Sequence, residues 1–379
     1  MIYLDYSATT KTSLEVLDTF VKVSNDFPYN SNSLHELGVK AKELEISSTR
    51  QIAKYLGVRE SEIIYTSGSS ESNNMAIKGI CSFYKNRGKH ILTTNLEHSS
   101  IYGPISYLQK NGFEVEILKT DSNGIVLIDD LKSKLRNDTI LVSICSVNSE
   151  TGILQPIDLI GKTIKENSNS FFHVDMTQSV GKVNVSLNNV DLASISAHKI
   201  YGIKGIGLLY KRDSVNIEPL IHGGKSTTKY RSGTPAVPLI ASFAKAIRLA
   251  FVDLDKKYEY VSNLNKKIRN SISSSSVFIN SNEYCIPHIL NISILNVKPE
   301  TMLHALEEED IYISTQSACS SSNSVSKAVL ELTKDEVRSK HSIRISLSYL
   351  TTLEDVDIFI KKFNEIVERL GNIRWRLLE

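Results

Sequence analysis

Apolar and polar positions alternate in blocks along most of the chain, and these blocks predict helices and strands in turn. Apolar residues recur at helical spacing from His35 to Leu56, and the pattern stops at Gly57, a residue type that often follows a helix. The run Thr139–Ile144 has the continuous apolar character of a strand buried on both faces. Similar strand signals occur at Glu62–Thr66, His90–Thr94, Phe113–Leu118, Phe171–Val174 and Ala193–Ile195. Strands that alternate with helices predict an α/β fold with a mainly parallel sheet covered on both sides.

The pattern changes near residue 250. A long helical stretch is expected from about Pro238 to Ser271, and a strand follows at Ile289–Ile294. A helix at Glu300–Glu308, a strand at Ile343–Leu347 and a closing helix from Leu353 complete the chain. We therefore expect a large domain over residues 13–250 and a smaller α+β domain made of residues 1–12 and 251–379.

Composition narrows the class of protein. The 379 residues include 44 Lys plus Arg and 42 Asp plus Glu, so the net charge of +2 gives no electrostatic case for direct nucleic-acid binding. No apolar stretch approaches the roughly 20 residues that span a bilayer, and no secretion signal opens the chain. The four cysteines show neither disulfide-scaffold nor zinc-site spacing: Cys81, Cys145, Cys285 and Cys319. These features predict a cytoplasmic protein with reduced thiols and no metal site.

Two charged residues stand at the ends of apolar runs and suggest the chemistry. Lys199 follows the strand-like run Asp191–Ile195, and Asp175 ends the run that begins at Phe171. A lysine at the end of a buried strand needs a covalent or charged partner, and the aldehyde of a cofactor is one such partner. Either residue alone is more often a surface charge. Together, a lysine for the aldehyde and a carboxylate for a pyridinium nitrogen predict a pyridoxal phosphate site.

Other polar residues fit the same site. The run Thr66–Glu71 lies between a strand and a helix, where free backbone amides bind anions, although ordinary helix capping is the more common explanation of such a run. The glycine spacing of Gly202–Gly207 does not match a dinucleotide fingerprint. His98 follows a strand on the ligand-binding side of the sheet, and His198 adjoins Lys199.

Cys319 differs from the other cysteines because its neighbours are small and polar, in the run Thr315–Asn323. Such a setting offers the access that a reactive thiol needs, but the local sequence supplies no positive charge to ionise it. An inert exposed cysteine is the alternative.

The chain resembles the cysteine desulfurases of the NifS/IscS type, within the class V, fold-type I pyridoxal phosphate enzymes. The resemblance extends from Tyr3 to about Leu370 and rests on motifs that occur in order: Asp5–Thr10, Thr66–Asn74, Glu97–His98, Val147–Gly152, His173–Ser179, Ser196–Lys199, Arg231–Thr234, Ser317–Cys319 and Ser342–Leu347.

The resemblance assigns roles toward pyridoxal 5'-phosphate. Lys199 would bond to the aldehyde and move the Cα proton, and Asp175 would pair with the pyridinium nitrogen. Gln178 would contact the ring hydroxyl, and His98 would stack on the ring and take part in proton transfer. The phosphate would be held by Ser69, Ser70, Ser196 and His198, and by Thr234 of a second subunit, which implies a homodimer.

The resemblance also implies a reaction. Asn148 and Arg344 would bind the carboxylate of L-cysteine, and Cys319 would take its sulfur as a persulfide and leave L-alanine. A sulfur-acceptor protein of iron–sulfur cluster assembly or of tRNA or cofactor thiolation would then receive the sulfur. A selenocysteine lyase, another class V enzyme, and a catalytically silent sulfur carrier are the alternatives.

The chain departs from the family pattern in one loop. At this point relatives usually have a glycine, then a glutamine or histidine, and then a glutamate. This chain instead has the basic, hydroxyl-rich segment Lys225–Tyr230. We expect this loop near the mouth of the site, adapted to a particular sulfur acceptor. The chain also ends at Glu379, one or two helical turns earlier than relatives that serve the iron–sulfur scaffold.

Overall fold

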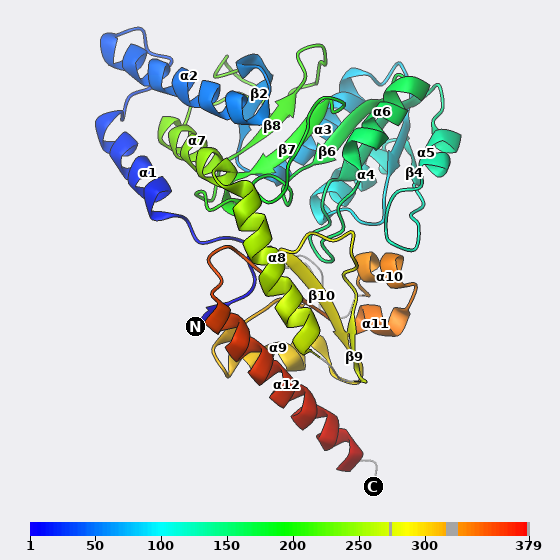
Figure 1. Ribbon diagram of the computed structural model, residues 1–379. Helices are drawn as coiled ribbons and strands as arrows, with labels where there is room; N and C mark the ends of the chain where they lie inside the picture. Colours follow the sequence, from blue (N-terminus) through cyan, green and yellow to red (C-terminus); the bar gives the residue numbers. More distant parts are fainter. Residues whose placement is uncertain (273–274, 316–324, 377–379) are drawn as a thin grey trace.

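A seven-stranded sheet forms the centre of the larger part of the molecule (Figure 1). The computed structural model describes residues 1–272, 275–315 and 325–376. Four neighbouring pairs of strands run parallel, while β8 is antiparallel to both of its neighbours. The order across the sheet is β2 (Ile63–Thr66), β8 (Gly207–Lys211), β7 (Leu192–Ser196), β6 (Phe171–Asp175), β5 (Thr139–Cys145), β3 (His90–Thr93) and β4 (Glu114–Ile117). The expected mainly parallel α/β sheet is confirmed, although the strand signal of β8 was missed.

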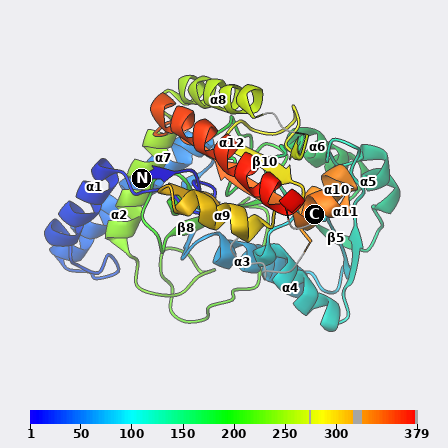
Figure 2. The same cartoon turned by 90° about the horizontal axis from the view of Figure 1, so that it is seen from below.

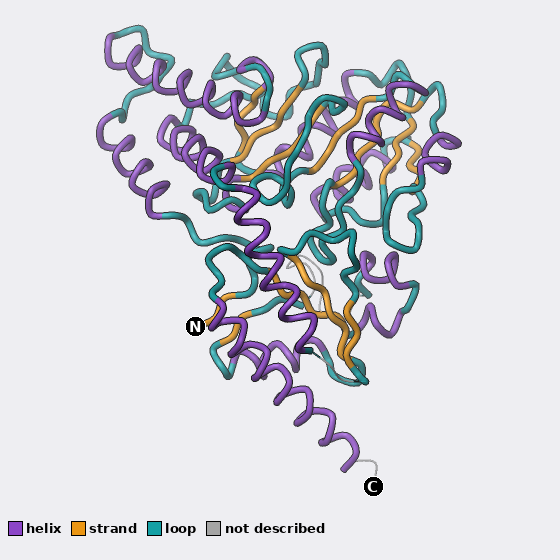
Figure 3. The backbone as a smooth tube through the Cα atoms, in the orientation of Figure 1, coloured by secondary structure: helices purple, strands orange, loops and turns teal. Residues whose placement is uncertain are grey.

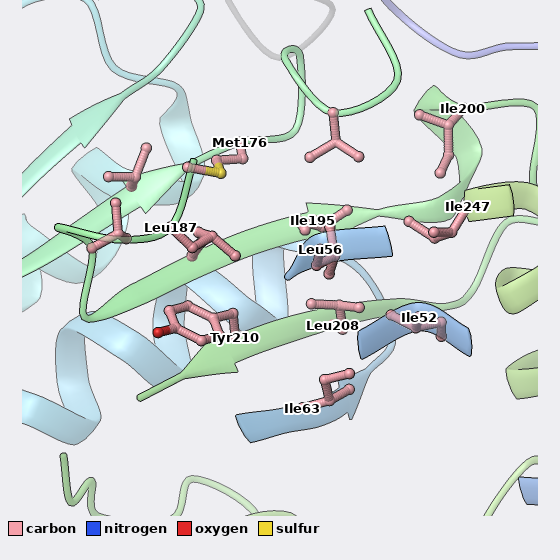
Figure 4. Close-up of a cluster of buried hydrophobic side chains, with 14 of the residues drawn as sticks. Ile52, Leu56, Ile63, Met176, Leu187, Ile195, Ile200, Leu208, Tyr210 and Ile247 are labelled. Carbon is pink, nitrogen blue, oxygen red and sulfur yellow. The ribbon is translucent and has the colours of Figure 1, made fainter. Parts of the chain in front are cut away.

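Helices cover both faces of this sheet because its central strands are apolar on both sides. Leu208 and Tyr210 of β8 face one hydrophobic core, and Leu209 faces the other. Figure 4 shows the first core, where side chains of β8 meet Ile52 and Leu56. The helices that cover this core are α2 (Glu36–Leu56), α5 (Ile128–Lys134), α6 (Ile157–Asn167) and α7 (Val237–Phe251). Helix α1 (Leu14–Asp26) packs on α7. The second core lies under α3 (Ser69–Phe83) and α4 (Ser99–Lys110).

A separate hydrophobic core forms from the two ends of the chain. Leu4 packs with residues between Val261 and Val367, and β1 (Ile2–Tyr3) pairs in parallel with β11 (Ile311–Tyr312). An antiparallel sheet, in the order β12 (Ser342–Ser346), β10 (Ile289–Ile294) and β9 (Val277–Ile279), lies beside this pair (Figure 3). The surrounding helices are α8 (Leu254–Ser271), α9 (Pro299–Glu307), α10 (Lys327–Thr333), α11 (Glu336–Lys340) and α12 (Leu353–Arg376), with α8 and α9 beside α12 (Figure 2). The domain boundaries stay a prediction.

One expected element is wrong. The single helix predicted from Pro238 to Ser271 is two helices, α7 and α8, separated by Val252 and Asp253. Asp253 adopts the left-handed conformation (φ 51°), which an aspartate tolerates better than most residues. The break redirects the chain, so α7 packs on α1 and α2 while α8 packs on α12. Among the described residues, no helix combines the length and apolar character that a membrane span requires.

Candidate active site

A cavity of about 530 Å³ lies at the carboxyl ends of the parallel strands, between the large sheet and the strand that carries Arg344. It brings together most of the residues predicted from the sequence: Lys199, Asp175, Gln178, His98, Ser69, Ser70, Ser196, His198 and Arg344. Asn148 and Thr234 are not among its lining residues, and Cys319 lies outside the described residues.

Lys199 ends a short 3₁₀ turn, η2 (Ala197–Lys199), directly after β7. Its Nζ donates hydrogen bonds to the carbonyl oxygens of Ser7 (2.6 Å) and Ala8 (2.7 Å). Both carbonyls belong to an N-terminal segment, residues 5–13, that runs across the lysine turn. Thr10 of this segment accepts a hydrogen bond from the backbone N–H of Tyr201, whose φ of 62° is unusual for a bulky residue. The N-terminal segment therefore fixes the turn that presents Lys199.

The carboxylate of Asp175 is oriented by two side chains for which the sequence suggested no role. Asn73 of α3 donates from Nδ2 to Asp175 Oδ2 at 2.9 Å and also to Ser100 Oγ. Thr177 donates to Asp175 Oδ1 from its backbone N–H at 3.0 Å and from its hydroxyl. The carboxylate is thereby held at the end of β6, facing the cavity. Asn73 and Thr177 stand within recognised motifs, but their function depends on three segments that meet only in the fold.

The protonation of the His98 ring follows from its hydrogen bonds. His98 is the residue before α4, and its Nδ1 accepts from the backbone N–H of Ser100 at 3.2 Å. A ring nitrogen that accepts from an amide carries no proton, so we assign the proton of the neutral ring to Nε2. Burial lowers the pKa of His98, which favours this neutral form.

The opposite end of the cavity has the features of a phosphate site. The first backbone N–H groups of α3 have no partners within the helix, and the hydroxyls of Ser69 and Ser70 lie beside them. A Cβ on Gly207 would lie 2.7 Å from the Cα of Gly68, so β8 approaches this turn closely because residue 207 is a glycine, while the φ of 151° at residue 68 favours glycine there. A phosphate fits this combination of amides and hydroxyls.

Two side chains at this end differ from simple expectation. Burial, reinforced by the charges of nearby lysines, lowers the pKa of His198 to about 4, so it would contact a phosphate as a neutral donor. Glu71 also lines the cavity, but its carboxylate is occupied by Arg231 Nε at 3.0 Å and by the backbone N–H of Ser67 at 2.7 Å. Those contacts offset its repulsion of an anion.

Arg344 of β12 presents a buried guanidinium to the cavity. Its Nη2 pairs with Asp5 Oδ1 at 2.7 Å, and its Nη1 donates to the carbonyl of Ser149 at 3.1 Å. Within the described parts of the chain, Nε has no hydrogen-bond partner. A guanidinium that lines a cavity is suited to binding a carboxylate ligand.

The two remaining predicted residues lie apart from the cavity wall. The Asn148 amide donates to the carbonyl of Leu96 at 2.8 Å, and its oxygen accepts from the backbone N–H groups of Glu150 and Thr151. These bonds organise the loop that carries Ser149, whose carbonyl contacts Arg344. Thr234 is exposed, outside the cavity of its own chain. Their roles toward substrate and phosphate stay predictions.

A parallel α/β sheet with a lysine after one strand, an aspartate at the end of its neighbour and an anion-binding helix end defines a pyridoxal phosphate enzyme of fold type I. The chain belongs to the class-V aminotransferase family, whose model, Aminotransferase class-V, matches residues 2–359. This family uses pyridoxal 5'-phosphate, and the residues of the cavity fit that cofactor.

Individual relatives agree along nearly the whole length. The chain is 40% identical to a protein named cysteine desulfurase IscS from Dictyoglomus turgidum, over 98% of this chain and 96% of that protein. A solved structure of a NifS-like protein superposes with a TM-score of 0.91 at 34% identity, covering 97% of this chain and 99% of the other. A structure described as SspA in complex with cysteine gives a TM-score of 0.82 at 30% identity, covering 93% and 100%.

Proposed function

We propose that the protein is a pyridoxal phosphate-dependent cysteine desulfurase that moves sulfur from L-cysteine to its own Cys319 and releases L-alanine. One observation carries this proposal. Lys199, Asp175 and Arg344 face one cavity in a chain that is similar, from end to end, to proteins named cysteine desulfurases.

The residues that would hold the cofactor are spread over the length of the cavity. Lys199 would bond to its aldehyde, Asp175 would pair with the ring nitrogen and Gln178 would donate to the ring hydroxyl. The α3 amides would hold the phosphate, with Ser69, Ser70, Ser196 and His198. Once bound, the cofactor supplies an electron sink that stabilises negative charge at the Cα of an attached amino acid.

The remaining groups would position the substrate and move its protons. Arg344 would receive the carboxylate of L-cysteine on the part of its guanidinium that lines the cavity, and Asn148 would support that contact. Lys199 would remove the Cα proton, because its amine faces the cavity from the end of β7. His98 would supply a proton from Nε2, the nitrogen assigned as protonated above.

The sulfur step would use the Cys319 thiolate as nucleophile. It would form an S–S bond with the substrate sulfur while the Cβ–S bond breaks and its electron pair stays on carbon, which takes a proton. The net change converts L-cysteine and a protein thiol into L-alanine and a protein persulfide. The described residues on either side of 316–324 lie near the site: Ser314 pairs through its backbone with Arg344, and the Ser326 hydroxyl donates at 2.6 Å to Glu150, the neighbour of the cavity residue Ser149.

The proposal extends to partners. A homodimer would bring Thr234 of one subunit to the phosphate of the other, which agrees with its exposed position outside its own cavity. A sulfur-acceptor protein of iron–sulfur cluster assembly or of a thiolation pathway would take the persulfide sulfur. The cytoplasmic location expected from cysteine usage stays a prediction.

The test is to incubate the purified protein with pyridoxal phosphate, L-cysteine and a thiol reductant, and to measure sulfide and alanine together. We expect equal amounts of both products, and loss of both in Cys319→Ala. Alanine without sulfide, or activity that survives the substitution, would contradict the Cys319 step and favour a different class V reaction. An absence of bound-cofactor absorbance would point to a silent sulfur carrier instead.

A further inference from the structure

Lys182 is a buried cation beside the proposed cofactor site to which neither the sequence nor the reaction assigns a role. It follows Gln178 in a tight turn after β6 and is only 8% exposed. Its Nζ donates to Gln178 Oε1 at 2.5 Å. In the described parts of the chain no carboxylate interacts with Lys182. The amide oxygen of Gln178 is neutral, so it offsets only part of the free-energy cost of burying the ammonium group.

The charged and titratable groups that face Lys182 make its position more costly. Lys199 lies on the turn after β7, and Arg344 lies on β12. His198 and His288 also face it, from the lysine turn and from the loop before β10. Burial first, and then the charges of Lys199 and Arg344, lower the pKa of Lys182 to about 7. A lysine maintained in such a place is a candidate for function.

The contact with Lys182 fixes which way the Gln178 amide points. An ammonium group can only donate, so Oε1 must face Lys182 and Nε2 must face the other way. There Nε2 donates to the Ser7 carbonyl at 2.9 Å, at the wall of the cavity. That carbonyl also accepts from Lys199 at 2.6 Å, so Gln178 shares it. By contrast, among the described residues Lys182 donates to Gln178 and not to the Ser7 carbonyl.

We propose that Lys182 is a positioning residue: it holds the Gln178 amide with its N–H groups toward the ring oxygen of the cofactor. The inference rests on the proposed function, because it assumes that pyridoxal phosphate occupies the cavity. The bound chromophore gains negative charge when it loses a proton, and an N–H donor at the ring oxygen favours that form. Loss of the donor should therefore raise the pH midpoint of its absorbance change.

The test compares the purified enzyme, loaded with pyridoxal phosphate, in wild-type, Lys182→Met and Lys211→Met forms. Lys211 is a matched control: it is 2% exposed, in β8, and its Nζ donates to the carbonyls of Arg212 and Val215. We expect Lys182→Met to raise the absorbance midpoint by about one pH unit, and Lys211→Met to leave it unchanged. Lys182→Arg, which keeps a charged donor, should restore most of the wild-type midpoint.

A double-mutant cycle separates positioning from a direct charge effect. If Lys182 acts through Gln178, Lys182→Met should shift the midpoint little in a Gln178→Ala background. Additive shifts would overturn the positioning role, as would a Lys182→Met midpoint equal to that of wild type. If Lys182→Met does not fold, Lys182→Gln replaces it in both arms. A wild-type protein that binds no cofactor would refute the proposed function, whereas normal binding with an unmoved midpoint would refute this inference alone.

Discussion

Both ends of the parallel strands in the large sheet hold buried or half-buried ionisable groups, but the two ends satisfy them in different ways. At the amino end, Arg136 pairs with Glu114 at 2.8 Å and with Asp138 at 2.9 Å, and His90 lies 3.3 Å from Glu116. At the carboxyl end, where the cavity lies, Lys199 donates to carbonyl oxygens and Lys182 to an amide.

The difference shows what each end requires. At the amino end, acidic side chains of the protein itself pair with the Arg136 guanidinium, so this cation has partners without a ligand. At the carboxyl end Arg344 pairs with Asp5, but Lys182 donates to an amide and Lys199 donates to carbonyl oxygens, and a cofactor phosphate and a substrate carboxylate would add negative charge there. Substitutions at the carboxyl end should therefore affect ligand binding and turnover, and those at the amino end should affect stability alone.

The strongest way to break this comparison is Lys199→Ala. We expect desulfurase activity to fall at least a thousandfold, on the order of 4 kcal/mol in the activation barrier, because the residue that bonds the cofactor and moves a proton is lost. The measurement is alanine formation under saturating L-cysteine, with Arg136→Gln as the matched control at the other end. Comparable losses in both variants would show that the two ends are not distinct.

Arg344→Lys tests whether the carboxylate is recognised by the guanidinium. The ammonium cannot reproduce both the Asp5 and Ser149 contacts and a substrate contact, so we expect kcat/KM to fall about 10- to 100-fold, chiefly through KM. Steady-state kinetics with L-cysteine provides the measurement. An unchanged KM would place the carboxylate elsewhere.

Glu97 gives a pH test of the carboxyl end. Burial raises its pKa to about 8, and its Oε2 has no hydrogen-bond partner among the described residues. The folded state therefore keeps a proton that the unfolded state releases above its ordinary pKa, so stability is lost as pH rises from about 4.5 to 8.

Glu97→Gln should remove that loss. Relative to wild type, the free energy of unfolding of this variant should rise by about 3 kcal/mol between pH 5 and pH 7.5, measured by urea unfolding at several pH values. A constant difference across this range would mean that Glu97 is ionised in the folded protein.

The smallest effect is expected at the amino end. Arg136 is about one-third exposed, so solvent screens its pairs, and Arg136→Gln should lower the free energy of unfolding by about 0.5–1 kcal/mol. Raising the salt concentration should reduce this difference. Cofactor absorbance and kcat should not change, and a change in either would connect the two ends of the sheet.

Much of the fold and site could be predicted because local signals and global structure agree. The β5 strand is buried throughout, as its apolar run predicts, and α2 ends at Gly57 in the left-handed conformation. Lys199 and Asp175 were predicted to share a site because each ends an apolar run, and because a lysine and a carboxylate together suit the aldehyde and ring nitrogen of one cofactor. A local pattern of apolar residues shows where a strand ends, so the sequence alone could locate the residues at those ends.

The remainder depends on contacts between distant segments. The break at Val252 and Asp253 was missed because a helical pattern continues through both residues, and only the packing of α8 on α12 requires a change of direction. Asn73, Thr177 and Lys182 hold other side chains in place, and such roles need atomic positions. The Asp5–Arg344 pair joins residues 339 positions apart, which no local pattern encodes.

The N-terminal segment sets an order of events during synthesis. Ile2 and Tyr3 pair with Ile311 and Tyr312, and the Ser7 amide donates to Ser346 Oγ. The carbonyls of Ser7 and Ala8 that accept from Lys199 are therefore synthesised well before Ser346, which is 339 positions after Ser7. At ordinary rates of translation these events lie roughly 20 to 70 seconds apart. A nascent chain therefore contains all strands of its large sheet well before it contains Ser346, so the contacts that fix the segment over Lys199 can form only after that sheet has been synthesised.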